Sequence, residues 1–194
     1  KEACERGDAT TAGVQLDLAV QSMRQMEALI RELHADALLR SSTGEMKVVA
    51  LDSVITAARM NLAPLIEARN VTLETVGLPT VKGSYTMLVQ LFINLFENAI
   101  KYAGEAEPMI RVRGLSADDG STVVQVADGG MGIPVSELET IFQPGARGAN
   151  AAHLPGSGLG LAFGRRIMQA HGGSLSALPA DHGAILELRF PADR

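Results

Sequence analysis

The residues best suited to chemistry are gathered in one short stretch, from position 94 to position 102. The stretch contains two carboxamides, an ammonium group and a phenol: Asn94, Asn98, Lys101 and Tyr102. Their spacings of four, three and one residues place them on one face of a helix, or at its edge. An amide oxygen can ligate Mg²⁺, an ammonium group attracts phosphate, and a phenol ring can lie against a base or a ribose. The stretch therefore suits a nucleoside triphosphate with its cation. An amphipathic helix with a polar rim is the alternative.

Two glycine-rich segments could complete a binding pocket. Asp128 ends an alternating run and is followed by GGMGIP. Its carboxylate can accept a hydrogen bond from an exocyclic amine such as that of adenine, and the glycines let the backbone approach a flat ring, although a plain turn is the alternative. The sequence GSGLGL at 156–161 opens a helical pattern, where exposed N–H groups and the helix dipole favour phosphate. No strand pattern immediately precedes it and it lacks the Gly-Lys-Ser/Thr of a P-loop, so we reject the dinucleotide and P-loop interpretations.

The stretch between Phe142 and Gly156 has the composition of a mobile loop. Besides Arg147 it contains five small residues with little to bury: Gly145, Ala146, Gly148, Ala149 and Ala151. A loop of this kind could close over a ligand, whereas the alternative is a surface loop with no role.

The elements around these segments could bring them together. Ser84 is a candidate N-cap for a helix that continues to about Tyr102. Two pairs of alternating strands are joined by turns that contain glycine, at 118–121 and 181–183. We expect strands at 46–49, 71–76, 109–116, 122–128, 174–178 and 184–190, and helices at 51–68, 84–102, 136–142 and 159–169. Strands in hairpins with helices between them indicate an α+β sandwich rather than a doubly wound parallel sheet.

The region before residue 44 has a different pattern. Its apolar residues alternate spacings of three and four: Leu16, Ala19, Met23, Met26, Ile30, Leu33 and Ala37. This is the seam of a coiled coil or helix bundle, so we expect one helix over 14–42, about 43 Å long. A narrow apolar stripe requires partner helices and predicts a homodimer, although the helix could instead lie on its own domain. The turn-forming residues at 41–44 predict two domains, 1–43 and 44–194.

Composition limits the possible functions. The 194 residues are 46% hydrophobic and 20% charged, which is typical of a globular protein. A single cysteine, Cys4, excludes a disulfide framework and suggests a reducing compartment. A net charge of −5 and the absence of tryptophan argue against nucleic-acid binding. No apolar run approaches a membrane span, so we expect membrane contact only through other parts of a longer parent protein.

In order and spacing, NLFENAIKY, DGGMGIP, IFQPGARG and GSGLGLA resemble the N, G1, F and G2 boxes of the sensor histidine kinases of two-component systems. The sequence QAHGGSL is similar to that family too. The resemblance covers residues 46–191, and the helix before them is similar to the second helix of the family's dimerisation domain. It implies the Bergerat ATP-binding sandwich, with a mixed, mostly antiparallel sheet and helices on one face, which gyrase and MutL share.

The resemblance also implies roles for individual residues toward ATP and Mg²⁺. Asn98 would ligate Mg²⁺, Asn94 and Lys101 would face the phosphates, and Arg147 could reach the γ-phosphate. Tyr102 would flank the purine, and Asp128 would hold its amine. The remaining nucleotide contacts would come from Gly130, Gly132, Ile133, Ser157, Gly158, Leu159, Gly160 and Leu161.

The implied reaction moves the γ-phosphoryl group of ATP to a histidine, and then to an aspartate of a response-regulator receiver domain. No histidine here matches the acceptor motif, and His34 reads as a residue at the edge of the bundle, so we expect the chain to bind ATP but not to label itself. The parent is expected to be a bacterial inner-membrane sensor with this region in the cytoplasm.

Departures from the family pattern keep two other functions open. Asn94 stands where gyrase-like relatives have a water-activating glutamate, which favours transfer over hydrolysis by a dimer gate. Glu97 points about 100° away from Asn98 around the helix, so we do not assign it as a base. Pro144-Gly145-Ala146 replace the usual aromatic and arginine, which weakens the expected docking of the loop. That weakening is the only support for a nucleotide-insensitive dimerisation scaffold.

Overall fold

The computed structural model describes residues 46–151, 154 and 156–192. The helix predicted at 14–42 and the domain boundary at residue 44 lie outside these residues. Within them, no helix combines the length and the hydropathy needed to cross a bilayer.

A five-stranded mixed sheet forms one layer of the molecule. Its strands follow the order β2-β4-β5-β7-β6 and comprise β2 (Thr72–Val76), β4 (Met109–Ser116), β5 (Thr122–Asp128), β6 (Ser174–Leu178) and β7 (Ala184–Phe190). β2 pairs parallel with β4, and all the other pairs in this sheet are antiparallel. A smaller antiparallel pair is formed by β1 (Lys47–Ala50) and β3 (Thr80–Gly83). The predicted hairpins are therefore confirmed, as is the α+β class.

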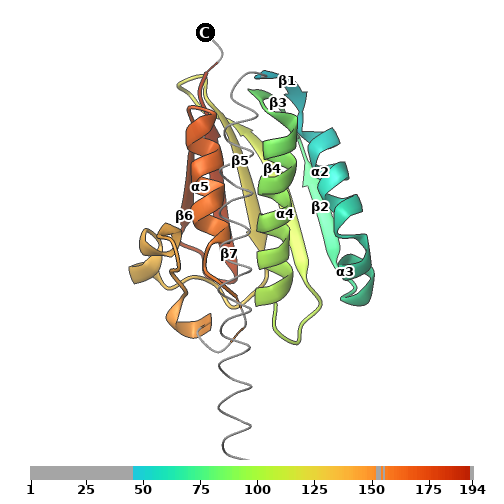
Figure 1. Ribbon diagram of the computed structural model, residues 1–194, viewed down its shortest axis with the longest axis vertical. Helices are drawn as coiled ribbons and strands as arrows, with labels where there is room; N and C mark the ends of the chain where they lie inside the picture. Colours follow the sequence, from blue (N-terminus) through green and yellow to red (C-terminus); the bar gives the residue numbers. More distant parts are fainter. Residues whose placement is uncertain (1–45, 152–153, 155, 193–194) are drawn as a thin grey trace, which may run out of the picture.

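The helices cover one face of the sheet, with α2, α4 and α5 side by side in Figure 1. They are α2 (Leu51–Asn61), α3 (Ala63–Ala68), α4 (Tyr85–Tyr102) and α5 (Gly160–Ala170). The prediction of one helix at 51–68 was wrong, because α2 ends at Asn61 and α3 begins at Ala63, with Pro64 in its first turn. Proline has no N–H to donate to the preceding turn, so the helix is interrupted there. The helix predicted at 136–142 forms two 3₁₀ turns instead, Val135–Glu137 and Thr140–Phe142.

The hydrophobic core lies between α4 and the sheet. Nine residues of α4 are buried: Met87, Leu88, Leu91, Phe92, Asn94, Leu95, Phe96, Ala99 and Ile100. The rings of Phe92 and Phe96 pack with centroids 5.8 Å apart. Because apolar residues recur every three or four positions, one face of α4 meets the sheet while its flanks pack against α2 and α5.

A buried histidine joins α4 to α5 at the end farther from Tyr102. The Ser84 N–H donates to Nε2 of His171 at 3.0 Å, and Nδ1 of His171 lies 2.7 Å from the Ile167 carbonyl. Because Nε2 accepts, the proton is on Nδ1, which donates to Ile167. Ser84 occupies the predicted N-cap position, but its side chain makes no capping hydrogen bond. A β-carbon on Gly83 would lie 2.7 Å from the His171 ring, so this close approach requires glycine.

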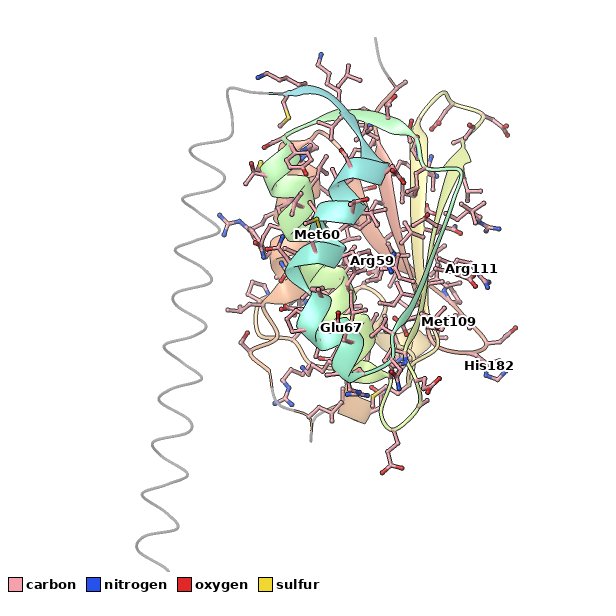
Figure 2. All side chains as sticks on the ribbon, turned by 90° about the vertical axis from the view of Figure 1, so that its right-hand side faces the viewer. Arg59, Met60, Glu67, Met109, Arg111 and His182 are labelled. Carbon is pink, nitrogen blue, oxygen red and sulfur yellow. The ribbon has the colours of Figure 1, made fainter. Side chains whose placement is uncertain are left out.

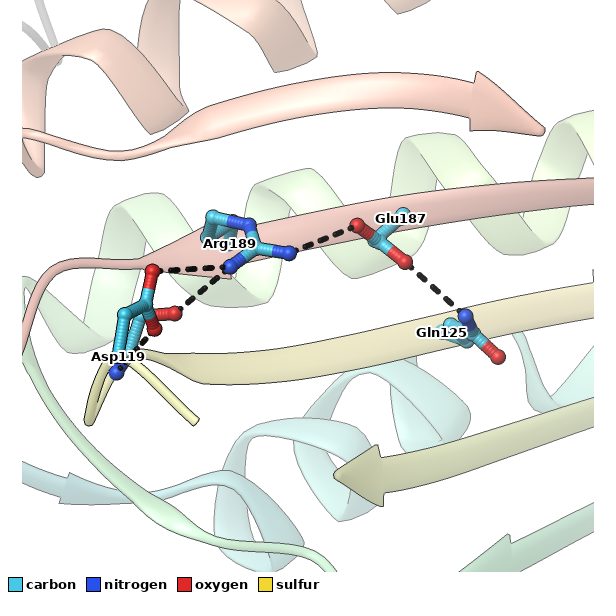
Figure 3. Close-up of polar contacts among 5 residues, drawn as sticks. Asp119, Gln125, Glu187 and Arg189 are labelled. Carbon is cyan, nitrogen blue, oxygen red and sulfur yellow. Dashed lines mark hydrogen bonds and ion pairs between the residues drawn. The ribbon is translucent and has the colours of Figure 1, made fainter. Parts of the chain in front are cut away.

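The other face of the sheet carries a row of polar side chains. Arg111 of β4 points away from the helices in Figure 2 and pairs with Glu74 of β2 at 2.9 Å. Across β5 and β7, Gln125 donates to Glu187 at 3.0 Å, and Arg189 lies 3.6 Å from Glu187 and 3.4 Å from Asp119 (Figure 3). The apolar side chains of the sheet are therefore buried on the face that the helices cover, and the opposite face is polar.

Candidate functional site

The last two turns of α4 form one wall of a cleft. Asn94 is buried, with 9% of its surface exposed, and Asn98, Lys101 and Tyr102 are half-buried. The Lys101 ammonium group donates to the Tyr102 hydroxyl at 3.0 Å and lies 4.5 Å from the centroid of the same ring. A positive charge and a phenol ring are thus held together at the end of the helix.

An outer cavity of about 330 Å³ brings this wall to the second glycine-rich segment. It is lined from α4 by Asn94, Glu97, Asn98, Lys101 and Tyr102, and from the other side by Gly156, Ser157, Gly158, Gly160 and Leu161. A β-carbon on Gly156 would lie 2.4 Å from Lys101 Nζ, and one on Gly160 would lie 3.6 Å from Asn98 Nδ2. The absence of these side chains leaves room beside the α5 N-terminus, where backbone N–H groups favour an anion.

An adjoining inner cavity of about 80 Å³ contains Asp128 at the end of β5. Its Oδ1 accepts hydrogen bonds from the Gly130 N–H at 2.9 Å and the Ala184 N–H at 3.3 Å. Burial raises the pKa of the Asp128 carboxyl, and these two backbone hydrogen bonds oppose the rise. Oδ2 makes no hydrogen bond with the described residues, so it can accept one from a ligand.

The two cavities form one cleft, because they share lining residues: Asn98, Tyr102, Ile141, Ala146 and Leu161. Among the other predicted site residues, Gly132 and Ile133 line the inner cavity. Leu159 and Gly130 line neither cavity. Gly130 packs against α4 instead, where a β-carbon would lie 2.6 Å from the Tyr102 carbonyl.

Segment 143–151, which we call the strap, lies between the two glycine-rich segments. The Gly145 N–H donates to the Gly158 carbonyl at 3.2 Å, and the Asn150 side chain donates to the Met131 and Gly132 carbonyls at 3.3 and 3.1 Å. Buried Phe142 immediately precedes the strap, and the Arg165 guanidinium lies 4.4 Å from the centroid of its ring.

Arg147 lines the inner cavity together with Asp128, and it does not line the outer cavity with Lys101. Its guanidinium donates to the Ala151 carbonyl at 3.2 Å and to the Leu154 carbonyl. The approach of Arg147 to a γ-phosphate therefore stays a prediction, and it would require these two hydrogen bonds to break.

Sequence reasoning missed several residues of the cleft. Glu97 was set aside for pointing away from Asn98, yet it lines the outer cavity. Ala184 and Leu186 of β7 line the inner cavity, because the antiparallel register pairs Ala184 with Asp128. Gly183 was assigned only to a turn, although a β-carbon there would lie 1.7 Å from the Asp128 carbonyl. Only the pairing of β5 with β7 could have revealed these last three.

The available metal ligands are mostly amide oxygens. Among the described residues there is no group of three or more His, Cys, Asp and Glu that could hold a metal ion. A cation in the outer cavity could take Asn98 or Asn94, besides the single carboxylate of Glu97, together with oxygens of the ligand, which is a ligand set that suits Mg²⁺.

Comparison with known proteins supplies the family context. Residues 83–194 match the model of the histidine kinase-, DNA gyrase B- and HSP90-like ATPases. The adaptive-response sensory kinase SasA of a Synechococcus strain is 32% identical over 164 residues, which cover 81% of this chain and 43% of SasA. The mycobacterial sensor histidine kinase MprB superposes with a TM-score of 0.65 at 27% identity, covering 76% of this chain and 97% of that structure.

A third comparison concerns an assembly. The histidine kinase ThkA, solved in complex with the response regulator protein TrrA, has a TM-score of 0.68 at 21% identity and shares the fold. The match covers 90% of this chain and 49% of that one. The present chain spans less than half the length of the curated relatives it matches.

Proposed function

Because the chain belongs to the family of histidine kinase-, DNA gyrase B- and HSP90-like ATPases, we propose that it is the ATP-binding catalytic region of a sensor histidine kinase. The observation that carries this proposal is that Asn98 and Asp128 line the same cavity. They lie 30 residues apart in sequence, so only the fold brings an amide oxygen and a half-buried carboxylate together.

The inner cavity would hold the purine. Asp128 Oδ2 would accept a hydrogen bond from the adenine amine while Oδ1 stays bonded to Gly130 and Ala184. Apolar side chains of the same cavity, including Ile133 and Leu186, would pack against the ring. Guanine presents a carbonyl at that position, which a carboxylate would repel, so we expect adenine nucleotides to be preferred.

The outer cavity would hold the phosphates. Lys101 supplies a positive charge and the α5 N-terminus supplies backbone N–H groups. Asn98 borders both cavities and would ligate Mg²⁺ that also binds phosphate oxygens. Mg²⁺ would neutralise the charge that develops during transfer. Arg147 would contribute only after leaving the Ala151 and Leu154 carbonyls.

The proposed reaction is an in-line transfer. An imidazole nitrogen of an acceptor histidine attacks the γ-phosphorus, the bond from that phosphorus to the β–γ bridging oxygen breaks, and ADP leaves. The phosphoryl group would then pass to an aspartate of a response-regulator receiver domain. We further propose that 1–43 joins two copies, and that the parent is an inner-membrane sensor with this region in the cytoplasm.

One observation favours a second candidate, ATP hydrolysis. Glu97 lines the outer cavity, and a carboxylate there could accept a proton from an attacking water. Release of phosphate by the chain without any protein acceptor, abolished by Glu97→Gln, would support hydrolysis. Absence of that release, together with ATP binding, would support transfer.

Calorimetric titration of ATP with and without Mg²⁺ tests the proposed function. We expect Asn98→Ala to lose the Mg²⁺-dependent part of the affinity. Asp128→Asn should weaken binding about ten- to hundredfold, the range for losing a hydrogen bond to a charged group. Asn61→Ala is the matched control, because Asn61 is exposed on α2 and its side chain donates to the Ala57 carbonyl within the same helix.

Equal binding by all these variants would remove Asn98 and Asp128 from the site. A failure of the unaltered chain to bind ATP would overturn the proposal and favour the dimerisation scaffold.

A further inference from the structure

The strap contacts both glycine-rich segments through its backbone and one side chain. At its start, the Gly145 N–H donates to the Gly158 carbonyl, and a β-carbon on Gly158 would lie 2.5 Å from the Ala146 carbonyl. Five of its residues line the inner cavity: Ala146, Arg147, Gly148, Asn150 and Ala151. A ligand in the inner cavity would therefore lie against the strap.

Asn150 joins the end of the strap to the segment that follows Asp128. One amide nitrogen donates to two successive carbonyls, those of Met131 and Gly132, at 3.3 and 3.1 Å. Beside it, both carboxylate oxygens of Glu137 accept a hydrogen bond from the Ala149 N–H, and each oxygen lies 3.2 Å from the Ala149 nitrogen. A β-carbon on Gly148 would lie 2.9 Å from Asn150 Oδ1 and 3.2 Å from Glu137 Oε2, so the two side chains close over a glycine.

Little apolar burial holds the strap in this position. Of its nine residues only Ala151 is buried, and most of the others are glycine, alanine or exposed polar residues. A segment with so few buried apolar contacts opens at low cost. The hydrogen bonds of Asn150 and Glu137 are therefore a large share of what keeps the strap against the 128–137 segment.

We propose that Asn150 is a positioning residue that fastens the strap over the base of the bound nucleotide and slows its release. This inference rests on the proposed function, because it requires a nucleotide in the inner cavity. Release then needs the strap to lift, and lifting breaks the bonds from Asn150 to Met131 and Gly132. Removing those bonds raises the open fraction and hence the dissociation rate.

Stopped-flow displacement of a fluorescent ATP analogue measures this rate directly. Asn150→Ala should speed dissociation about two- to tenfold, the factor for losing ordinary hydrogen bonds, without slowing association. Asn150→Asp should speed it at least as much, because a carboxylate would face two carbonyl oxygens. Asn61→Ala, which removes an exposed amide that donates to the Ala57 carbonyl within α2, should leave both rates unchanged.

Hydrogen exchange without nucleotide gives a second readout. The Ala149 and Ala151 amides, which donate to Glu137 and to the Gly148 carbonyl, should exchange faster in Asn150→Ala, whereas the α4 amides should not. If the unaltered chain binds ATP, two results would overturn this inference alone. One is unchanged hydrogen exchange of the strap in Asn150→Ala, and the other is an unchanged rate of nucleotide release from that variant. No ATP binding by the unaltered chain overturns the proposed function and this inference with it.

Discussion

The two sides of the cleft are held in place by different forces. α4 buries nine residues in the core, whereas the strap buries only Ala151 and depends on hydrogen bonds to its neighbours. Changes in α4 should therefore act on the stability of the whole domain. Changes in the strap and in the turns around Asp128 should act first on local geometry and on the ligand. Three variants test this contrast in order of decreasing expected effect.

The largest loss of stability is expected from Phe96→Ala. Phe96 has 0% of its surface exposed and packs against Phe92 in the core. Its truncation should lower the free energy of unfolding by about 3–5 kcal/mol, because it leaves a cavity that its neighbours cannot fill. Denaturant unfolding followed by circular dichroism measures this loss. Met60→Ala, at a side chain that is 72% exposed, should stay within about 0.5 kcal/mol of the unaltered chain. If Phe96→Ala lowered the free energy of unfolding by less than Met60→Ala does, α4 would not be the packed side of the cleft.

A smaller but more local loss is expected from Gly183→Ala, with Gly104→Ala as its control. Both glycines have positive φ, +65° and +66°, so alanine costs each about 1 kcal/mol of backbone strain. A β-carbon at Gly104 meets nothing within 4 Å, whereas one at Gly183 would lie 1.7 Å from the Asp128 carbonyl. Gly183→Ala should therefore cost about 1–3 kcal/mol more and weaken ATP binding. Equal melting temperatures for the two variants would show that the turn yields without disturbing Asp128.

The smallest expected effect depends on pH and concerns the bond that joins α4 to α5. Burial lowers the pKa of His171 below its ordinary value of 6.5, although its hydrogen bond to the Ile167 carbonyl opposes this. The unfolded chain then binds the proton at a higher pH than the folded chain does. The histidine's contribution to stability is therefore complete above about 6.5 and is lost as the pH falls through the folded pKa.

Thermal unfolding between pH 7 and pH 5 measures this loss. His171→Gln keeps an acceptor for the Ser84 N–H but cannot titrate, so its stability should fall less steeply with pH. Parallel curves for the two proteins would exclude His171 as the source of the slope.

The packed side of the cleft could be predicted from the sequence, and the hydrogen-bonded side could not. The candidate N-cap at Ser84 indicated α4, and the spacing from Asn94 to Tyr102 placed four side chains on one part of that helix. Alternation of polar and apolar residues located β4, β5, β6 and β7 with their turns. The split at Leu62 was missed because the apolar pattern continues through Pro64, although proline itself was a visible signal.

What escaped prediction depends on contacts between distant segments. Nothing in the types of Asn150 and Glu137 indicates that their side chains meet carbonyls and an amide elsewhere in the chain. Ala184 belongs to the site only because β7 pairs with β5. The alternation of polar and apolar residues locates a strand but does not tell which strand lies beside it. Glu97 was excluded by helix geometry alone, but the outer cavity is wide enough to include it.

The close alternation of core and cleft residues along α4 also limits how this protein can vary. Leu95 and Phe96 are buried between two residues that line the cleft, Asn94 and Asn98, and buried Ala99 follows directly. Consider a saturation library that is screened once for solubility and once for nucleotide retention. In this stretch, substitutions of the core residues should fail the solubility screen, and substitutions of the neighbouring cleft residues should fail the nucleotide screen. The strap should pass the first screen almost freely and be filtered only by the second. Diversification of this protein should therefore proceed through the strap.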